Sequence, residues 1–163
     1  MRSVGLSVLL AVTAAACGGS ASSPVSPSPT PSTPVSVVGA WSGTSTDSVR
    51  SEQMGLNLTQ VGTSVTGTMT FADAGRGMMG NGTMQGTMNG SAVTFHMAVP
   101  AGGFSGSMSP CSMGIDATAT ISADGMTMTG TYSGQLSGMM PGMMSQMQTC
   151  GGTMTNGRFT LTR

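Results

Sequence analysis

The stretch from Met54 to Phe71 restricts the possible fold more than any other part of the chain. Apolar residues occupy alternate positions on both sides of a Val-Gly-Thr triplet at 61–63, and Asn and Thr fill most of the positions between them. This alternation puts the apolar side chains on one face of a strand, and a short glycine-containing triplet is typical of a hairpin turn. We therefore predict a β-hairpin. Its apolar positions are Met54, Leu56, Leu58, Val65, Met69 and Phe71.

The later chain repeats this unit. Asn89-Gly90 favours a type I′ hairpin turn, and Ala123-Asp124-Gly125 is a second turn signal. Because no long segment of helical period lies between the strands, we predict an all-β fold. An antiparallel up-and-down barrel of about eight strands is the expected class, and a sandwich is the alternative. The predicted strands are Val38–Ser45, Met54–Gln60, Ser64–Phe71, Gly82–Met88, Ser91–Ala98, Ile115–Ile121, Met126–Ser133 and Gly157–Arg163.

Composition narrows the class of partner. Only 6% of the residues are charged, the formal net charge is zero, and all five basic residues are arginine. This chain lacks the basic surface that nucleic acid requires, so we expect no nucleic-acid partner. Glycine is abundant, and Gly67, Gly86 and Gly130 take places on the apolar faces. In a small barrel, such glycines are expected to let the strands bend sharply.

Residues 1–16 have the form of a secretory signal peptide. Arg2 gives a positive start, and a short apolar run from Val4 to Val12 leads to small residues before Cys17. The apolar run is too short to span a bilayer.

The segment Ala14-Ala15-Ala16-Cys17 resembles the lipobox of bacterial lipoproteins. The resemblance implies cleavage before Cys17, acylation of Cys17 and a lipid anchor in the bacterial cell envelope. Gly18 stands where enteric lipoproteins retained in the inner membrane have Asp, which implies the outer membrane. An ordinary secreted protein cleaved after Ala16 is the alternative.

Residues 17–35 form the predicted connection between the anchor and a folded domain at 36–163. Five of the eight prolines lie here, separated mainly by Ser, Thr and Val. Such a segment has almost nothing to bury, so we expect a disordered, extended tether.

Gly39-Ala40-Trp41 opens the first predicted strand. A Gly-x-Trp tripeptide at this place resembles the opening motif of the lipocalins and the wider calycin group. The resemblance implies an eight-stranded barrel in which a basic residue of the last strand, Arg158 or Arg163, packs over Trp41. The alternative is that Trp41 is only a core aromatic residue at the barrel base.

Cys111 and Cys150 remain once Cys17 is assigned to the anchor. In an oxidising envelope compartment we expect these two cysteines to form a disulfide. The alternative is a thiolate metal ligand with the neighbouring Met108 and Met113.

Methionine is unusually frequent, with 18 residues. Seven lie on predicted apolar strand faces, where Met serves as a flexible core filler. An interior lined by Met would also suit an apolar ligand. These residues are Met54, Met69, Met84, Met88, Met97, Met126 and Met128.

Five more methionines fall within residues 139–147, a predicted exposed connection. Soft thioethers select Cu(I) over hard cations, and such segments resemble those of bacterial envelope proteins that handle copper and silver. The resemblance implies a Cu(I) or Ag(I) site, and Cu(I) would then be the cofactor. A hydrophobic lid over one barrel end and sacrificial oxidation are the alternatives. The candidate ligands are Met139, Met140, Met143, Met144 and Met147.

Catalysis has little support. The five acidic residues are scattered, mostly beside turns, and no nucleophile is recognisable beside His96, the single histidine. His96 lies on the polar face of its strand, where it is either solvated or one member of a metal site. We therefore do not expect an enzyme.

The predicted function is that of an envelope-anchored binding lipoprotein whose ligand is an apolar small molecule or a soft metal ion. The alternative is a protein-interaction or enzyme-inhibitor lipoprotein of the envelope, because small barrel lipoproteins that inhibit lysozymes or proteases are similar in plan. The expected partners are the membrane, through the anchor, and either a small ligand or an envelope protein.

Overall fold

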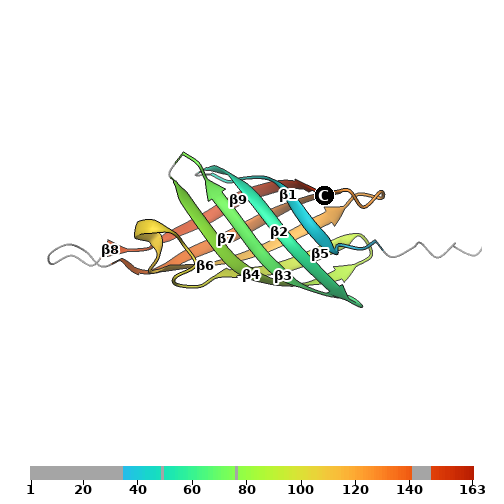
Figure 1. Cartoon of the computed structure of the whole chain (residues 1–163), viewed down its shortest axis with the longest axis horizontal. Coiled ribbons are helices and arrows are strands. Elements are labelled where there is room, and N and C mark those ends of the chain that lie inside the picture. Colours follow the sequence, from blue (N-terminus) through green and yellow to red (C-terminus); the bar gives the residue numbers. More distant parts are fainter. Residues whose placement is uncertain (1–34, 49, 76, 141–147) are drawn as a thin grey trace, which may run out of the picture. The chain divides into compact units, whose positions relative to one another are not determined.

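The structure is a computed structural model that describes residues 35–48, 50–75, 77–140 and 148–163. It contains a closed antiparallel β-barrel of eight strands, which confirms the predicted fold class (Figure 1). All eight predicted strands are present, and most extend beyond the predicted bounds. The elements are β1 (Gly39–Thr46), β2 (Ser51–Val61), β3 (Ser64–Asp73), β4 (Met78–Asn89), β5 (Ala92–Val99), the 3₁₀ helix η1 (Gly106–Met108), β6 (Cys111–Ile121), β7 (Thr127–Met140), β8 (Gln148–Thr149) and β9 (Gly152–Thr162).

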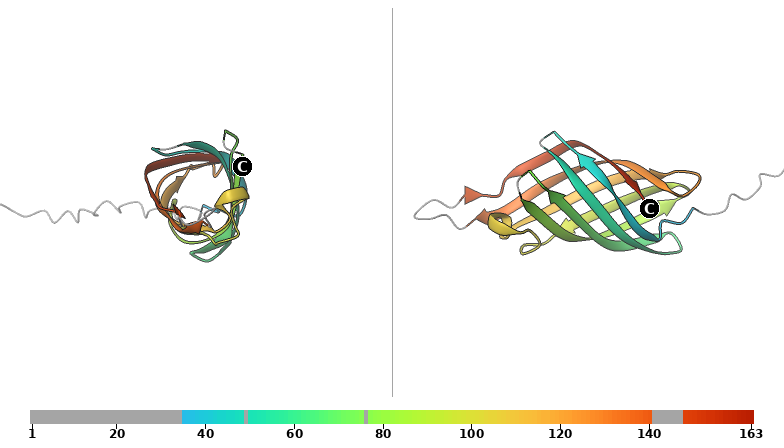
Figure 2. Two further views of the ribbon diagram at one scale, coloured as in Figure 1. Left: turned by 90° about the vertical axis from the view of Figure 1, so that its left-hand side faces the viewer. Right: turned by 45° about the horizontal axis from the view of Figure 1, so that its top comes forward.

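The barrel closes by pairing neighbours in the chain. Strands β1 to β7 pair in sequence order, β9 pairs with β7, and β9 also pairs with β1 to complete the ring. The two-residue strand β8 pairs with the end of β7, where Met139 lies opposite Thr149. Figure 2 shows the ring of strands in its left-hand view. The connectivity is the predicted up-and-down meander, in which each of the eight barrel strands described here has two partners and leaves no long open edge.

The hairpin predicted at Met54–Phe71 is formed by β2 and β3. Their register runs from Gln53 opposite Ala72 to Val61 opposite Ser64, so Gly62 and Thr63 make the turn. Gly62 has φ +61°. A positive φ at the first of two central residues is the glycine-first arrangement of a type II′ turn.

The turn predicted at Asn89-Gly90 differs from the expectation. Asn89 pairs with Ala92, so the central residues are Gly90 and Ser91. Gly90 has φ +62°, whereas Asn156 is the one non-glycine residue with positive φ in the described part of the chain. The type I′ prediction was therefore wrong, because the β4–β5 ladder continues through Asn89 and the turn shifts by one residue.

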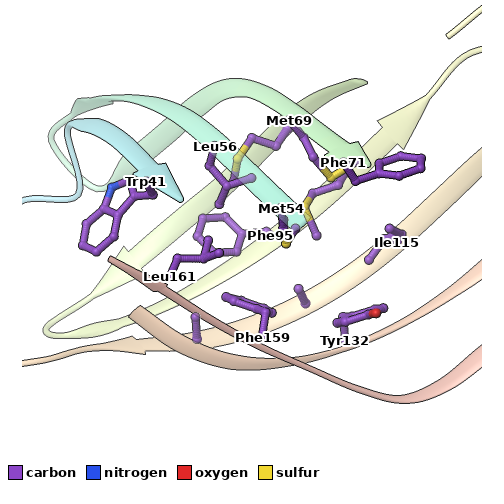
Figure 3. Close-up of a cluster of buried hydrophobic side chains, with 14 of the residues drawn as sticks. Trp41, Met54, Leu56, Met69, Phe71, Phe95, Ile115, Tyr132, Phe159 and Leu161 are labelled. Carbon is purple, nitrogen blue, oxygen red and sulfur yellow. The ribbon is translucent and has the colours of Figure 1, made fainter. Parts of the chain in front are cut away.

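Large apolar side chains fill the barrel interior. Figure 3 shows side chains from β1, β2, β3, β5, β6, β7 and β9 directed into one shared core. The glycines on these faces are places of close approach: a Cβ on Gly67 would overlap the Asn57 carbonyl oxygen, and one on Gly130 would overlap the Phe159 ring. Six of the seven methionines predicted to be buried are at most 6% exposed, namely Met54, Met69, Met84, Met88, Met97 and Met128.

Met126 is the exception, since 48% of it is exposed. Strand β7 begins only at Thr127, and the preceding turn sets the position of Met126. In that turn Asp124 Oδ1 accepts the backbone N–H of Met126 at 2.9 Å. Met126 therefore does not belong to the buried face, because β7 begins one residue after the predicted bound.

Trp41 closes the end of the barrel that carries the 62–63, 90–91 and 122–126 turns, here called the tryptophan end. It is 1% exposed, and its Nε1 donates to the Val37 carbonyl at 2.8 Å. The Arg163 guanidinium lies 4.8 Å from the indole ring centroid, and Arg163 Nη1 donates to the Val38 carbonyl at 2.9 Å. The basic residue over Trp41 is thus Arg163, while Arg158 is exposed on the outer face.

The predicted signal peptide, Cys17 and nearly all of the tether lie outside the described residues. Within residues 35–163, leaving aside 49, 76 and 141–147, there is no helix long and apolar enough to cross a membrane.

Candidate ligand cavity at the disulfide end of the barrel

The opposite end of the barrel, here called the disulfide end, contains a cavity of about 540 Å³. It lies where the β1–β2, β3–β4 and β5–β6 connections meet the beginning of β9. Most of the side chains around it are apolar, and four of them are methionines. The lining residues are Arg50, Gly77, Met78, Phe104, Ser105, Gly106, Met108, Met113, Leu136, Gly151, Gly152, Thr153 and Met154.

The β5–β6 connection forms one wall of the cavity. Phe104 is 4% exposed and packs edge-to-face on Phe71, with ring centroids 5.6 Å apart. Ser105 donates its backbone N–H to the Met79 carbonyl at 2.9 Å, and its Oγ accepts the Met79 N–H at 2.9 Å. Asn81 N–H donates to the Gly103 carbonyl at 2.8 Å. These bonds attach the connection to β4, so the cavity wall is joined to the barrel.

A disulfide lies beside this wall. Cys111 and Cys150 are at bonding distance, with their Cα atoms 5.8 Å apart, which confirms the predicted pair. Both residues are buried, and Cys150 N–H donates to the Gly138 carbonyl at 3.0 Å. The Met108 sulfur lies 4.0 Å from Cys111 Sγ. The disulfide therefore joins the start of β6 to the segment that leads into β9. Met113 of β6 and Gly151 of that segment line the cavity.

Arg50 is the charged residue of the described cavity lining. Its side chain is 13% exposed, and its Nε lies 3.3 Å from Glu52 Oε2 and 3.8 Å from Asp47 Oδ2. The guanidinium carbon is 5.8 Å from the Phe71 ring centroid. Nη2 points to the Met154 sulfur at 3.5 Å. Arg50 is thus held between two carboxylates on one side and apolar cavity groups on the other.

The carboxylates belong to a polar cluster inside the barrel. The Asp47 side chain is fully buried and that of Glu52 is 8% exposed. Tyr132 donates its hydroxyl to Asp47 Oδ2 at 3.3 Å, and Ser45 donates to Glu52 Oε1 at 3.3 Å. Period-two alternation explains this placement, since Ser45 follows Trp41 on the inner face of β1 and Glu52 precedes Met54 on that of β2.

The cluster changes the acidity of two groups. Burial raises the pKa of Glu52 above its ordinary value, and Arg50 opposes that rise by favouring the ionised carboxylate. Burial, followed by the negative charge of Asp47, raises the pKa of Tyr132 to about 12. Asp73 and Asp47 also raise the pKa of Glu52, so two further acidic residues lie within electrostatic range of the Glu52 carboxylate.

Sequence analysis did not identify this cluster. In the sequence Asp47, Glu52 and Asp73 are scattered and lie beside turns, but the β1–β2 connection and the end of β3 meet at one barrel end. The ladder places Gln53 opposite Ala72, so Glu52 and Asp73 are neighbours across it. The signal that could have identified them is the period-two alternation continued past the predicted bounds, because each acid lies two residues beyond an inward-facing strand residue, namely Ser45, Met54 or Phe71.

The predicted metal ligands are only partly described. Met139 and Met140 belong to strand β7 instead of a connection, because the ladder continues through them to Thr149 and Gln148. Met139 is 63% exposed. Met143, Met144 and Met147 lie outside the described residues, so the metal site in this segment stays a prediction.

His96 lies on the outer face of the barrel. Its Nδ1 is 2.8 Å from Asp116 Oδ1, and the two side chains are 63% and 81% exposed. Strand register places these residues directly opposite each other on β5 and β6. Among the described residues, no group of three or more His, Cys, Asp and Glu side chains could hold a metal ion.

Comparison of the chain with protein-family models, with curated proteins and with solved structures gives no match.

Proposed function

We propose that this protein is a lipid-anchored binding protein of the bacterial cell envelope that takes up an apolar small molecule at the disulfide end. The observation that carries the proposal is the cavity of about 540 Å³, lined mainly by Met, Phe and Leu with Arg50 as its charged group. Small-molecule sites typically combine a largely apolar lining with a few polar groups, in volumes of about 300–1,000 Å³. Methionine side chains adapt to different ligand shapes, which suits an apolar ligand class.

The anchor is proposed from the lipobox-like segment ending at Cys17, and its test is separate from that of the cavity. Labelling the expressing bacterium with a radioactive fatty acid should mark the protein, and a C17S variant should lose the label. A C17S variant that keeps the label would contradict the lipoprotein assignment.

Uptake of an apolar molecule is tested with N-phenyl-1-naphthylamine, whose fluorescence rises in apolar surroundings. The mature chain carrying C17S should bind this dye. G152W should weaken binding, because Gly152 lines the cavity and a Cβ there has no atom within 4 Å, so the indole can enter without disturbing the strand.

G114W is the matched control. Gly114 is also a strand glycine whose Cβ would meet nothing within 4 Å, but it does not line the cavity. Dye binding that G152W and G114W reduce equally would place the dye elsewhere. No binding by the parent chain would reject apolar uptake.

A soft metal ion is the second candidate ligand, because four thioethers surround the same cavity. Cu(I) competition titrations on the parent chain and two multiple variants separate the possible sites. If the cavity binds Cu(I), replacing the cavity methionines by Leu should abolish binding. If the 139–147 segment binds Cu(I), only replacing the methionines of that segment should abolish it. The first set is Met78, Met108, Met113 and Met154, and the second is Met139, Met140, Met143, Met144 and Met147.

A further inference from the structure

The cavity surface contains one charged side chain among the described residues, that of Arg50. Its Nε is directed to Glu52 and Asp47, which fix the guanidinium in place. Its Nη2 faces the Met154 sulfur at 3.5 Å, and Met154 also lines the cavity. A thioether is a weak hydrogen-bond acceptor. Among the described residues, the Nη2 donor of Arg50 is therefore matched with a weak acceptor at an apolar cavity surface.

We propose that Arg50 binds a neutral hydrogen-bond acceptor on the ligand, such as the carbonyl oxygen of a ketone, ester or amide. This inference rests on the proposed uptake of an apolar molecule and adds the chemistry of the ligand's polar group. The carbonyl oxygen would take the position at Nη2 where the Met154 sulfur now lies, and the apolar body would contact Phe104, Met113 and Leu136.

The charges around Arg50 favour a neutral ligand over an anionic or a cationic one. Asp47, Glu52 and Asp73 act together on the cluster, so an anionic ligand would meet a guanidinium whose charge is already balanced by nearby carboxylates. A cationic ligand would meet Arg50 first, because none of these three acids lines the cavity. A neutral acceptor gains the hydrogen bond without repulsion from the carboxylates or from the guanidinium.

The ion pairs also prepare the site for such a ligand. The Arg50 side chain is 13% exposed and is held by two carboxylates and the Phe71 ring, so little side-chain freedom is lost on binding. A hydrogen bond to a charged donor in these surroundings should favour the acceptor ligand by on the order of tenfold to a hundredfold.

The experiment compares three naphthalenes of nearly equal size as competitors of the dye. 2-Acetylnaphthalene carries the carbonyl, 2-isopropenylnaphthalene replaces its oxygen with CH₂, and 2-naphthoate is the anion. The ratio of ketone to alkene affinity is measured for the parent chain and for variants, so that differences in hydrophobicity cancel. The ratio should fall tenfold or more in R50M/D47N/E52Q, which removes the guanidinium without leaving either of its carboxylate partners charged.

R158M is the matched control, because Arg158 is exposed on the outer face. It should leave the ratio unchanged. If the triple variant does not fold, the carbonyl stretching frequency of bound 2-acetylnaphthalene decides on the parent chain alone. A shift to lower wavenumber than in a hydrocarbon solvent is expected, and a frequency equal to that in hydrocarbon overturns the inference.

The possible failures are distinct. If neither the dye nor any naphthalene binds, the proposed function fails. If all bind but R50M/D47N/E52Q keeps the ketone-to-alkene ratio, or 2-naphthoate binds most tightly, apolar uptake stands and the role of Arg50 is rejected.

Discussion

Substitution of Gly67 by Ala tests whether the barrel depends on backbone approach at its inward glycines. Gly67 lies on β3 opposite Leu58 of β2. A Cβ at this position would overlap the Asn57 carbonyl oxygen and lie 2.9 Å from Leu58 Cδ2. The backbone oxygen belongs to a paired strand and cannot rotate away as a side chain would. The new methyl group must therefore displace the two strands.

Gly114 on β6 provides the opposite case. It is also a paired strand residue without positive φ, but a Cβ there would meet no atom within 4 Å. G114A should stabilise the protein by about 0.4–1 kcal/mol, because alanine reduces the entropy of the unfolded chain. G67A gains the same entropic benefit but adds a methyl group to a packed interior, for which the net cost is about 1–3 kcal/mol. The two variants should therefore differ by about 1.5–4 kcal/mol in free energy of unfolding.

Urea unfolding followed by Trp41 fluorescence measures both values, since Trp41 is the only tryptophan. With a slope of about 2 kcal/mol per M urea, G67A should lower the midpoint by about 0.5–1.5 M and G114A should raise it slightly. A G67A protein at least as stable as the parent would refute close approach as the reason for glycine at this position. Destabilisation of both variants to the same degree would instead indicate a general cost of replacing strand glycines.

Three other expectations concern the polar cluster and the disulfide. Tyr132, the single tyrosine, should titrate at a pKa of about 12 by ultraviolet absorbance in the folded protein and near 10 in urea. D47N should lower the pKa of Tyr132 in the folded protein, and a pKa near 10 in the folded parent would contradict the burial of its hydroxyl. Because the folded pKa of Glu52 is raised, the contribution of Glu52 to stability is fully present below pH 4.5 and is lost as the pH rises through the folded pKa. The difference in free energy of unfolding between the parent and E52Q should therefore decrease over that window, and a constant difference would argue against a raised pKa. Replacing Cys111 and Cys150 by Ala opens a loop with a sequence separation of 39, which should lower the free energy of unfolding by about 4 kcal/mol in urea titrations; equal stability with and without the disulfide would show that it constrains neither state.

Strand content was predictable because period-two alternation is a local property of the chain. The side chains of Met54, Leu56 and Leu58 share a face in any extended conformation, and burial of that face selects the register. The extra length of β4 and β7 was not predictable in this way. At Gly80, for example, an inward position carries no side chain because the Phe71 ring of the next strand occupies the space.

Turn details depended on the ladder as much as on the turn residues. Asn89-Gly90 has the composition of a type I′ turn, yet pairing of Asn89 with Ala92 shifts the turn to Gly90-Ser91. Met126 continues the apolar alternation in sequence, but the preceding turn leaves it exposed. At Asn89 the ladder runs further than predicted, and at Met126 the strand begins one residue later than predicted.

The sequence by itself determined the inward faces of the strands and the meander order, because these follow from local alternation and short connections. It also predicted the Cys111–Cys150 pair, which the structure confirms. Only the tertiary structure decided the site. Arg50 and Met154 are 104 residues apart, and the acids beside Arg50 come from the turn after β1 and the starts and ends of other strands. Barrel closure brings these segments to one end, and no local pattern encodes which inward polar residues will meet there.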